Sequence, residues 1–169
     1  MNPHVQARLK NSFIVFDSDA NGYLQRADFE RMARRVTRVM GQQEGSAKAQ
    51  AVLDGHLRFW AGLAAEADSD HDAKISFDEY ARRSFGPGSF TAHVQPLAKS
   101  IAALADTDND GQISKQEFIA LLCAVGFNAA DYSDFFQTLD SDGDGAITIE
   151  QFVAMLEDFY TNSNPAAQN

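Results

Sequence analysis

The chain has 169 residues, a hydrophobic content of 44% and a formal net charge of -10. These values fit one compact domain or two small fused lobes, and they exclude a chain that is disordered by composition. A surface this acidic argues against nucleic-acid binding, for which a basic surface is expected. The N-terminal region contains no long apolar run, so we expect no signal peptide, no membrane-spanning segment and a cytoplasmic protein.

Four helix–loop–helix units are expected along the chain. The acidic pattern Asp-x-Asp-x-Asp/Asn begins at Asp17, Asp68, Asp106 and Asp140. Apolar residues spaced by three and four flank each occurrence, which predicts amphipathic helices on both sides. Before the second occurrence, the expected apolar face consists of Leu53, Leu57, Trp60 and Ala64. The first two occurrences are the farthest apart, so we expect an additional loop within residues 41–51.

Acidic loops of this kind suit calcium, a hard cation that takes about 6 to 8 oxygen ligands. In a calcium loop of about 12 residues, positions 1, 3 and 5 supply side-chain oxygens and position 7 supplies its backbone carbonyl. Position 12 is normally a bidentate Glu, and position 6 is normally Gly because the backbone turns sharply there.

Loop 1 spans residues 17–28, and its expected ligands are Asp17, Asp19, Asn21, Tyr23 and Asp28. Position 12 is Asp rather than Glu, and we expect its shorter side chain to bind through one oxygen. Such a site is nearer to six-fold coordination, which magnesium tolerates, so we expect mixed calcium and magnesium character.

Loop 2 spans residues 68–79, and its expected ligands are Asp68, Asp70, Asp72, Lys74 and Glu79. Position 6 is Ala73, and a left-handed conformation costs a residue with a side chain about 1–2 kcal/mol. We expect this strain to weaken the site, but the complete ligand set still predicts binding.

Loop 3 spans residues 106–117, and its expected ligands are Asp106, Asp108, Asp110, Gln112 and Glu117. Gly111 occupies position 6, so every position fits the calcium-loop pattern. Loop 3 is therefore expected to be the best site.

Loop 4 spans residues 140–151, and its expected ligands are Asp140, Asp142, Asp144, Ala146 and Gln151. The amide of Gln151 cannot supply the charged, bidentate contact of a Glu at position 12. We therefore expect loop 4 to be the weakest site or a mainly structural one.

The apolar residues at position 8 are expected to join the loops in pairs through short β-bridges. Leu24 should face Ile75, and Ile113 should face Ile147. The expected division is an N-terminal pair (residues 1–85), a C-terminal pair (residues 90–161) and a disordered tail (residues 162–169). Gly86, Pro87, Gly88 and Ser89 separate the two pairs.

The loops resemble those of the EF-hand superfamily. The four-unit length and the long first offset resemble sarcoplasmic calcium-binding proteins, and residues 17–24 with residues 26–29 resemble calerythrin-like prokaryotic members. The resemblance implies an all-α fold of four EF-hands, with two packed pairs in one compact globule. It also implies a calcium buffer or signal modulator.

A calcium sensor, which exposes an apolar surface and binds a target protein, stays open as an alternative. Sensors of that kind use Met-rich surfaces, whereas this chain has 4 Met and 13 Phe. We therefore favour a monomeric buffer without a nucleic-acid or membrane partner. The four histidines show no ligand or catalytic spacing, so we expect no enzyme.

Two further features have simple interpretations. A basic stripe consists of Arg31, Arg34, Arg35 and Arg38. It is either a solvated helix face that offsets the nearby acidic loops or a docking patch for an acidic partner, and we favour the former. The single cysteine, Cys123, lies in an apolar run and is expected to be a buried, inert thiol. One cysteine forms no intrachain disulfide, which fits a reducing compartment.

Overall fold

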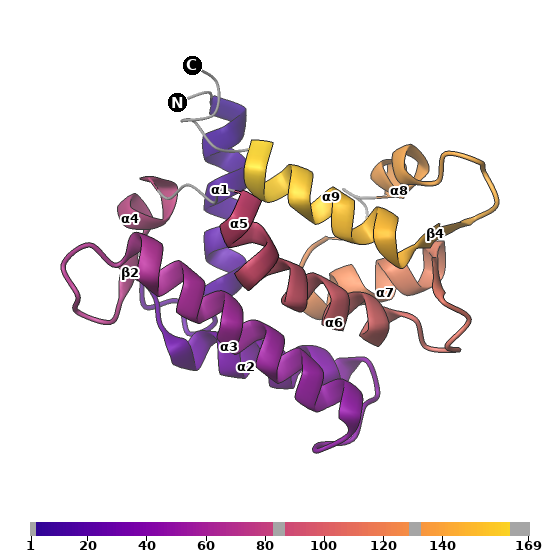
Figure 1. Ribbon diagram of the computed structural model, residues 1–169, viewed down its shortest axis with the longest axis horizontal. Coiled ribbons are helices and arrows are strands. Elements are labelled where there is room, and N and C mark those ends of the chain that lie inside the picture. Colours follow the sequence, from indigo (N-terminus) through magenta and orange to yellow (C-terminus); the bar gives the residue numbers. More distant parts are fainter. Residues whose placement is uncertain (1–2, 83–86, 129–132, 163–169) are drawn as a thin grey trace.

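The computed structural model describes residues 3–82, 87–128 and 133–162, and most of them are helical (Figure 1). The N-terminal half contains α1 (Pro3–Phe16), β1 (Tyr23–Leu24), α2 (Arg26–Val39), α3 (Ala47–Ala67), β2 (Ile75–Ser76) and α4 (Phe77–Arg82). The C-terminal half contains α5 (Pro87–Ser89), the π-helical turn η1 (Phe90–Val94), α6 (Gln95–Ala105), β3 (Gln112–Ser114), α7 (Lys115–Val125), α8 (Ser133–Leu139), β4 (Ala146–Thr148) and α9 (Ile149–Asn162). The fold is therefore all-α, with four helix–loop–helix units.

Two short antiparallel sheets join the loops in pairs, as the sequence predicted. In the first sheet, Leu24 of β1 lies opposite Ile75 of β2, and both side chains are fully buried. In the second sheet, Ile113 of β3 lies opposite Ile147 of β4, and both are again buried. Each sheet fixes the distance between its two loops, so the loops of a pair cannot move independently.

Local hydrogen bonds determine where several helices begin and end. The Ser46 side chain accepts a hydrogen bond of 3.2 Å from the Ala49 backbone N–H and caps the start of α3. The loop between α2 and α3 is thus limited to residues 40–46, shorter than the expected segment 41–51. Gly126 ends α7 in a left-handed conformation, with φ at +113°.

The buried face of α3 differs from the expected one. The apolar spacing predicts Leu53, Leu57, Trp60 and Ala64, but the fully buried positions are Val52, Gly55, His56, Phe59, Gly62, Leu63 and Ala67. Leu53 and Trp60 are only partly buried at the edge of the core. The buried residues also form one stripe, but it is shifted by one residue from the expected stripe. The shift arises because Gly55 and Gly62, which lack a side chain, face the close contacts with Leu97 and His93.

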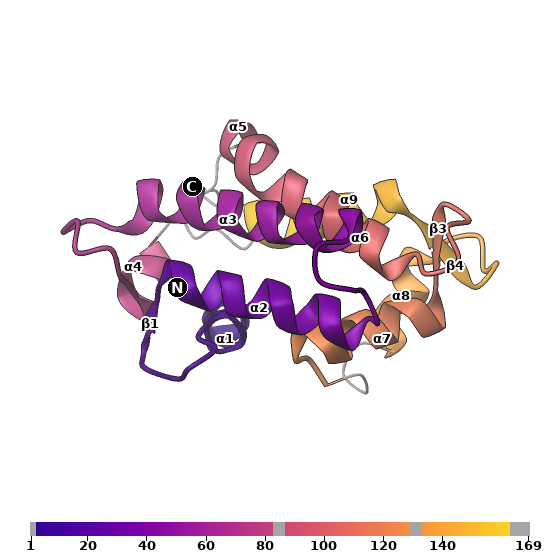
Figure 2. The same cartoon turned by 90° about the horizontal axis from the view of Figure 1, so that it is seen from below.

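The two halves meet where α3 lies alongside α6 (Figure 2). At Gly55 of α3 the two backbones come so close that a Cβ atom there would lie 2.9 Å from the Cα atom of Leu97. One heptad further along α3, a Cβ atom at Gly62 would collide with the ring of His93. Two glycines on one side of α3 therefore allow the halves to pack as one compact globule.

Three expectations about the chain change with the structure. Helix α4 ends at Arg82, residues 83–86 lie outside the described part, and Pro87 already begins the next helical segment. Helix α9 continues to Asn162, and the remaining tail, residues 163–169, lies outside the described residues. The prediction of a buried thiol is wrong, because Cys123 is exposed. Leu121 and Ala124 take the buried face of α7, and Cys123 lies on another side of the helix.

None of the helices in the described ranges is long and apolar enough to cross a membrane.

Candidate metal centres

All four loops share one network of hydrogen bonds around position 1. In loop 1, Asp17 accepts hydrogen bonds from the backbone N–H groups of Asn21 at 3.1 Å and Gly22 at 2.9 Å. The same two bonds occur at Asp68, Asp106 and Asp140. The N–H group of position 7 donates to the side chain of position 5 in every loop. This network curls each loop around its own acidic side chains.

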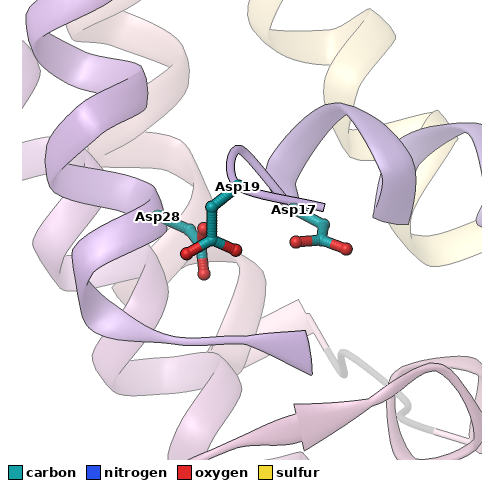
Figure 3. Close-up of side chains that lie close together, drawn as sticks. All are labelled: Asp17, Asp19 and Asp28. Atoms are coloured by element: carbon teal, nitrogen blue, oxygen red, sulfur yellow. The ribbon is translucent and has the colours of Figure 1, made fainter. Parts of the chain in front are cut away.

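The curled loops bring carboxylates close together. Figure 3 shows Asp17, Asp19 and Asp28 of loop 1 around a common space, and oxygens of all three lie within 4.8 Å of one another. Three further clusters meet the same distance limit: Asp68, Asp70 and Asp72; Asp106, Asp108 and Glu117; and Asp140, Asp142 and Asp144. Hard, anionic oxygens are the donors that Ca²⁺ and Mg²⁺ prefer, so the residues present fit these cations.

The position-12 glutamates of loops 2 and 3 are held by matching sets of donors. The Oε1 atom of Glu79 accepts from the Ser69 N–H and hydroxyl, and Oε2 accepts from the Ser76 N–H and hydroxyl. Thr107 and Ser114 make the same four bonds to Glu117. These bonds tie the exit helix of each loop to both ends of the loop.

The same donors keep both carboxylates ionised. Hydrogen bonds from the Ser76 backbone and from the Ser69 and Ser76 hydroxyls lower the pKa of Glu79 to about 2. Burial raises the pKa of Glu117, but hydrogen bonds from Thr107 and Ser114 outweigh that effect and lower it to about 2. Both side chains therefore carry their full negative charge at neutral pH.

Backbone strain differs among the loops. Position 6 is left-handed in every loop, and Ala73 of loop 2 has φ at +61°, as the sequence predicted. Position 4 is also left-handed in every loop, which sequence reasoning missed; its residues are Ala20, His71, Asn109 and Gly143. Loop 2 thus has a side chain at both strained positions, whereas loop 4 has glycine at both.

Loop 4 differs from the others at position 12. The Oε1 atom of Gln151 accepts a hydrogen bond of 2.7 Å from the Thr148 N–H. Its Nε2 atom donates to the backbone carbonyl of Leu139 at 3.3 Å. Gln151 therefore ties α9 to the end of α8, and one of its two polar atoms is a donor that repels a cation.

Loop 1 differs because a guanidinium group lies against its acids. The Nη2 atom of Arg31 lies 2.8 Å from Oδ2 of Asp19 and 2.7 Å from Oδ1 of Asp28. Arg31 therefore offsets acids of loop 1, as the favoured interpretation of the basic stripe expects, and it does so through direct contacts. Arg35, on the same stripe, donates to the backbone carbonyl of Val125 at the end of α7.

Some of these contacts have a recognisable signal in the sequence. Ser or Thr occupies position 2 in all four loops and position 9 in loops 2 to 4. Ser76 with Glu79, and Ser114 with Glu117, match the capping-box spacing at the start of a helix. The contact of Arg31 with loop 1 has no comparable signal, since long side chains can adopt many rotamers.

Comparison with known proteins agrees with this geometry. Residues 6–84 match an EF-hand domain pair, residues 103–122 match an EF hand, and residues 120–158 match an EF-hand domain pair. Calerythrin of Saccharopolyspora erythraea is 32% identical over 139 residues, which cover 79% of this chain and 78% of that protein. The chain belongs to the EF-hand family. It is a calcium-binding EF-hand protein similar to calerythrin.

Two other relatives extend the comparison. The sarcoplasmic calcium-binding protein alpha chain of Penaeus vannamei is 30% identical over 115 residues, covering 62% of this EF-hand chain and 58% of that protein. A solved structure, described as the basis for prokaryotic calcium-mediated regulation by a Streptomyces coelicolor calcium-binding protein, has a TM-score of 0.80 and 29% identity. That match covers 93% of this chain and 98% of the other.

Proposed function

We propose that this EF-hand protein is a calcium buffer or signal modulator that takes up two to four ions. The convergence of carboxylates in all four loops is the observation that supports it most strongly. In this proposal, the side-chain ligands are Asp17, Asp19, Asn21, Asp28, Asp68, Asp70, Asp72, Glu79, Asp106, Asp108, Asp110, Glu117, Asp140, Asp142, Asp144 and Gln151. The backbone carbonyl ligands belong to Tyr23, Lys74, Gln112 and Ala146.

The loops are proposed to differ in strength. Loop 3 combines a complete ligand set with Gly111 at position 6, so we place it first. Loop 1 takes calcium or magnesium, because the short side chain of Asp28 favours a smaller coordination number. Loop 4 is the weakest, because the Gln151 amide carries no charge and one of its two polar atoms is a donor, which cannot bind a cation.

A buffer is favoured over a sensor because the core is closed and aromatic. Phe16 stacks on Phe29 with ring centroids 5.1 Å apart, and Phe118 lies 5.4 Å from Phe136 in the other half. Large apolar side chains exposed in the described part are Ile14, Tyr23 and Val39, which lie on three different elements. Scattered single residues of this kind do not form a docking groove.

A sensor remains the second candidate because of one comparison. The Streptomyces coelicolor relative is described in terms of calcium-mediated regulation. By analogy, this chain would open on binding calcium and present apolar surface to a target protein. The proposed buffer instead keeps α3 packed on α6 in both states.

Several coarser properties belong to the same proposal. We infer a monomeric, cytoplasmic protein without catalytic activity, built from an N-terminal pair (residues 1–85) and a C-terminal pair (residues 90–161). The relatives named above are calcium-binding proteins, which supports a non-catalytic role. His56 is buried and bonded to the Val52 carbonyl, so this histidine is not available for catalysis.

Calorimetric titration with calcium, with and without magnesium, tests the proposal. A dye that reports exposed apolar surface is followed in the same samples. A buffer binds at least two calcium ions and leaves dye fluorescence nearly unchanged. A large rise in dye fluorescence would favour the sensor, and fewer than two bound ions would contradict the loop assignments.

A further inference from the structure

Arg31 connects three groups of loop 1. Its Nε atom donates to the Ser18 hydroxyl at 2.7 Å, and its Nη2 atom donates to Asp19 and Asp28. Asp19 is at position 3 and Asp28 is at position 12, and both belong to the carboxylate cluster of loop 1. The guanidinium group therefore contacts two of the three carboxylates that would bind the ion.

Asp28 is the buried partner of the Arg31 guanidinium group. Its side chain is fully buried, whereas the Arg31 side chain is 45% exposed. Asp28 also accepts hydrogen bonds from the Ser18 N–H at 3.1 Å, the Ser18 hydroxyl at 2.9 Å and the Gln25 N–H at 2.8 Å. A buried carboxylate with this many donors has one orientation, and the Arg31 fork fits that orientation.

The corresponding position in the other loops does not contact the acids. Three residues beyond position 12 lie Arg82 after loop 2, Ala120 after loop 3 and Ala154 after loop 4. Arg82 donates through Nε to the backbone carbonyl of Asp78 at 2.9 Å rather than to a loop carboxylate. Among the residues that the structure describes, loop 1 is thus the loop whose carboxylates are contacted by an arginine side chain.

We propose that Arg31 is a built-in counter-cation that sets the calcium affinity of loop 1 below that of loop 3. The proposal rests on the proposed function, because it assumes that loop 1 is a calcium site. Arg31 neutralises part of the acidic repulsion when the loop is empty. An incoming ion must then share Asp19 and Asp28 with the guanidinium or displace it.

The size of the effect follows from charge and distance. The three acids of the loop 1 cluster with Arg31 carry a net charge of -2, whereas the four acidic ligands of loop 3 carry -4. A single positive charge a few ångströms from a divalent ion weakens binding by roughly tenfold, even in a high dielectric. Arg31 therefore separates loop 1 from loop 3 through charge, in addition to the short side chain of Asp28.

The test follows one amide signal for each loop. The Gly22 N–H donates to Asp17 and the Gly111 N–H donates to Asp106, so their signals in proton–nitrogen NMR spectra report loops 1 and 3 separately. Calcium chloride is titrated into the full chain and into the Arg31→Gln variant. We expect the Gly22 midpoint to fall roughly tenfold in the variant and the Gly111 midpoint to stay unchanged.

Matched variants separate contact from bulk charge. Arg34→Gln removes the same charge from the same helix, and Arg82→Gln removes the arginine at the equivalent place after loop 2. We expect neither to change the Gly22 midpoint by more than about twofold, because long-range surface charges are screened. If the Gly22 midpoint fell as far in Arg34→Gln as in Arg31→Gln, the proposal would be overturned.

A second readout uses the protein without metal. In excess chelator, Arg31→Gln should unfold at a lower temperature than Arg34→Gln, because Asp19 and Asp28 lose their counter-charge. Arg31→Lys keeps the charge but not the fork, so it should keep the Gly22 midpoint close to wild type. An unchanged or weakened Gly22 response in Arg31→Gln would overturn the proposal, and an unchanged unfolding temperature would also overturn it.

Failure of the proposed function gives a different result. If neither Gly22 nor Gly111 responds to calcium in the wild-type chain, the calcium-site assignments are wrong and this inference falls with them. If Gly22 and Gly111 both respond to calcium in the wild-type chain but Arg31→Gln leaves the Gly22 midpoint unchanged, the calcium-site assignments hold and the proposed role of Arg31 is wrong.

Discussion

The Nζ atom of Lys48 donates a hydrogen bond of 2.7 Å to the backbone carbonyl oxygen of Asp106. Lys48 lies in the first turn of α3, in the N-terminal half, and Asp106 is position 1 of loop 3, in the C-terminal half. Arg35 of α2 makes a second contact of this type, to the carbonyl of Val125 at the end of α7. The N-terminal half therefore contacts the third EF-hand at the start of its loop and at the end of its exit helix.

Lys48→Met should weaken loop 3, because Asp106 loses the donor that holds its backbone. A charged hydrogen bond of this kind contributes about 1.5–3 kcal/mol, so we expect unfolding free energy to fall by roughly 1–2 kcal/mol. The Gly111 midpoint in a calcium titration should rise several-fold. Lys99→Met is the matched control on the exposed side of α6 and should change neither value. Equal effects of the two variants would show that only net charge matters.

Gly55→Ala should loosen the contact between the halves. The added Cβ would lie 2.9 Å from the Cα of Leu97 and 2.8 Å from the Ser100 hydroxyl, so backbone must shift. Overpacking of this kind costs about 1–3 kcal/mol, to be measured by denaturant unfolding. Gly88→Ala adds the same group where no atom lies within 4 Å and should be nearly neutral. A neutral Gly55→Ala would contradict the close crossing of α3 and α6.

Much of the fold follows from the sequence because the loop pattern fixes its own register. Once position 1 is located at Asp17 or Asp106, position 8 must be Leu24 or Ile113, and the pairing with Ile75 or Ile147 follows. The family resemblance and the four loops followed from the same pattern. Local spacing therefore predicts everything that depends on one loop and its flanking helices.

The features that sequence reasoning missed depend on contacts between distant segments. The buried face of α3 includes Gly55, His56 and Gly62, which are not large apolar residues, so the apolar pattern places that face one residue away. Cys123 is exposed because its helix buries one side, although the run around it is uniformly apolar. The contact of Arg31 with loop 1 depends on a side-chain rotamer, which spacing does not determine.

Ala73→Gly should strengthen loop 2. The left-handed conformation of Ala73 costs about 1–2 kcal/mol, and glycine removes that cost. We expect loop 2 to gain up to roughly tenfold in calcium affinity, measured from the amide signal of residue 73. The reverse change in loop 4, Gly145→Ala, should introduce the same strain and lower stability. No gain in Ala73→Gly would mean that the loop adjusts without strain.

Gln151→Glu should convert loop 4 into a stronger site. The carboxylate restores the charge at position 12 and removes the donor that now contacts the Leu139 carbonyl. Calorimetry should then detect an additional or tighter calcium site. Glu150→Gln changes the neighbouring charge in the opposite direction and should leave the ion count unchanged. Unaltered stoichiometry and affinity in Gln151→Glu would contradict the account of position 12.

The metal-free protein should lose stability in mild acid because of His56. Burial lowers the pKa of His56 to about 4, although its hydrogen bond to Val52 acts in the opposite direction. In the unfolded chain the pKa is about 6.5, so the unfolded state binds more protons between these values. Stability is therefore complete above about pH 6.5 and falls by up to ~3 kcal/mol as pH drops toward 4.

The measurement is denaturant unfolding in excess chelator from pH 7.5 to pH 4.5. His56→Gln should lose most of this slope, whereas His71→Asn, which replaces an exposed histidine, should retain it. Glu79 and Glu117 stay ionised in the folded chain, where their pKa is about 2, so they add to the slope only toward pH 4.5, where the unfolded chain begins to protonate them. The slope above about pH 5.5 is therefore assigned to His56. A slope between pH 7.5 and about pH 5.5 that survives His56→Gln would contradict the assignment.

The four inequivalent calcium loops are tested most directly by one calcium titration read from four amide signals. The N–H groups of position 6 donate to the position-1 carboxylate in every loop; they belong to Gly22, Ala73, Gly111 and Gly145. We predict that Gly111 responds first, that Gly22 and Ala73 respond at higher calcium, and that Gly145 responds last or not at all. Four signals with one common midpoint, or fewer than two that respond, would contradict the account.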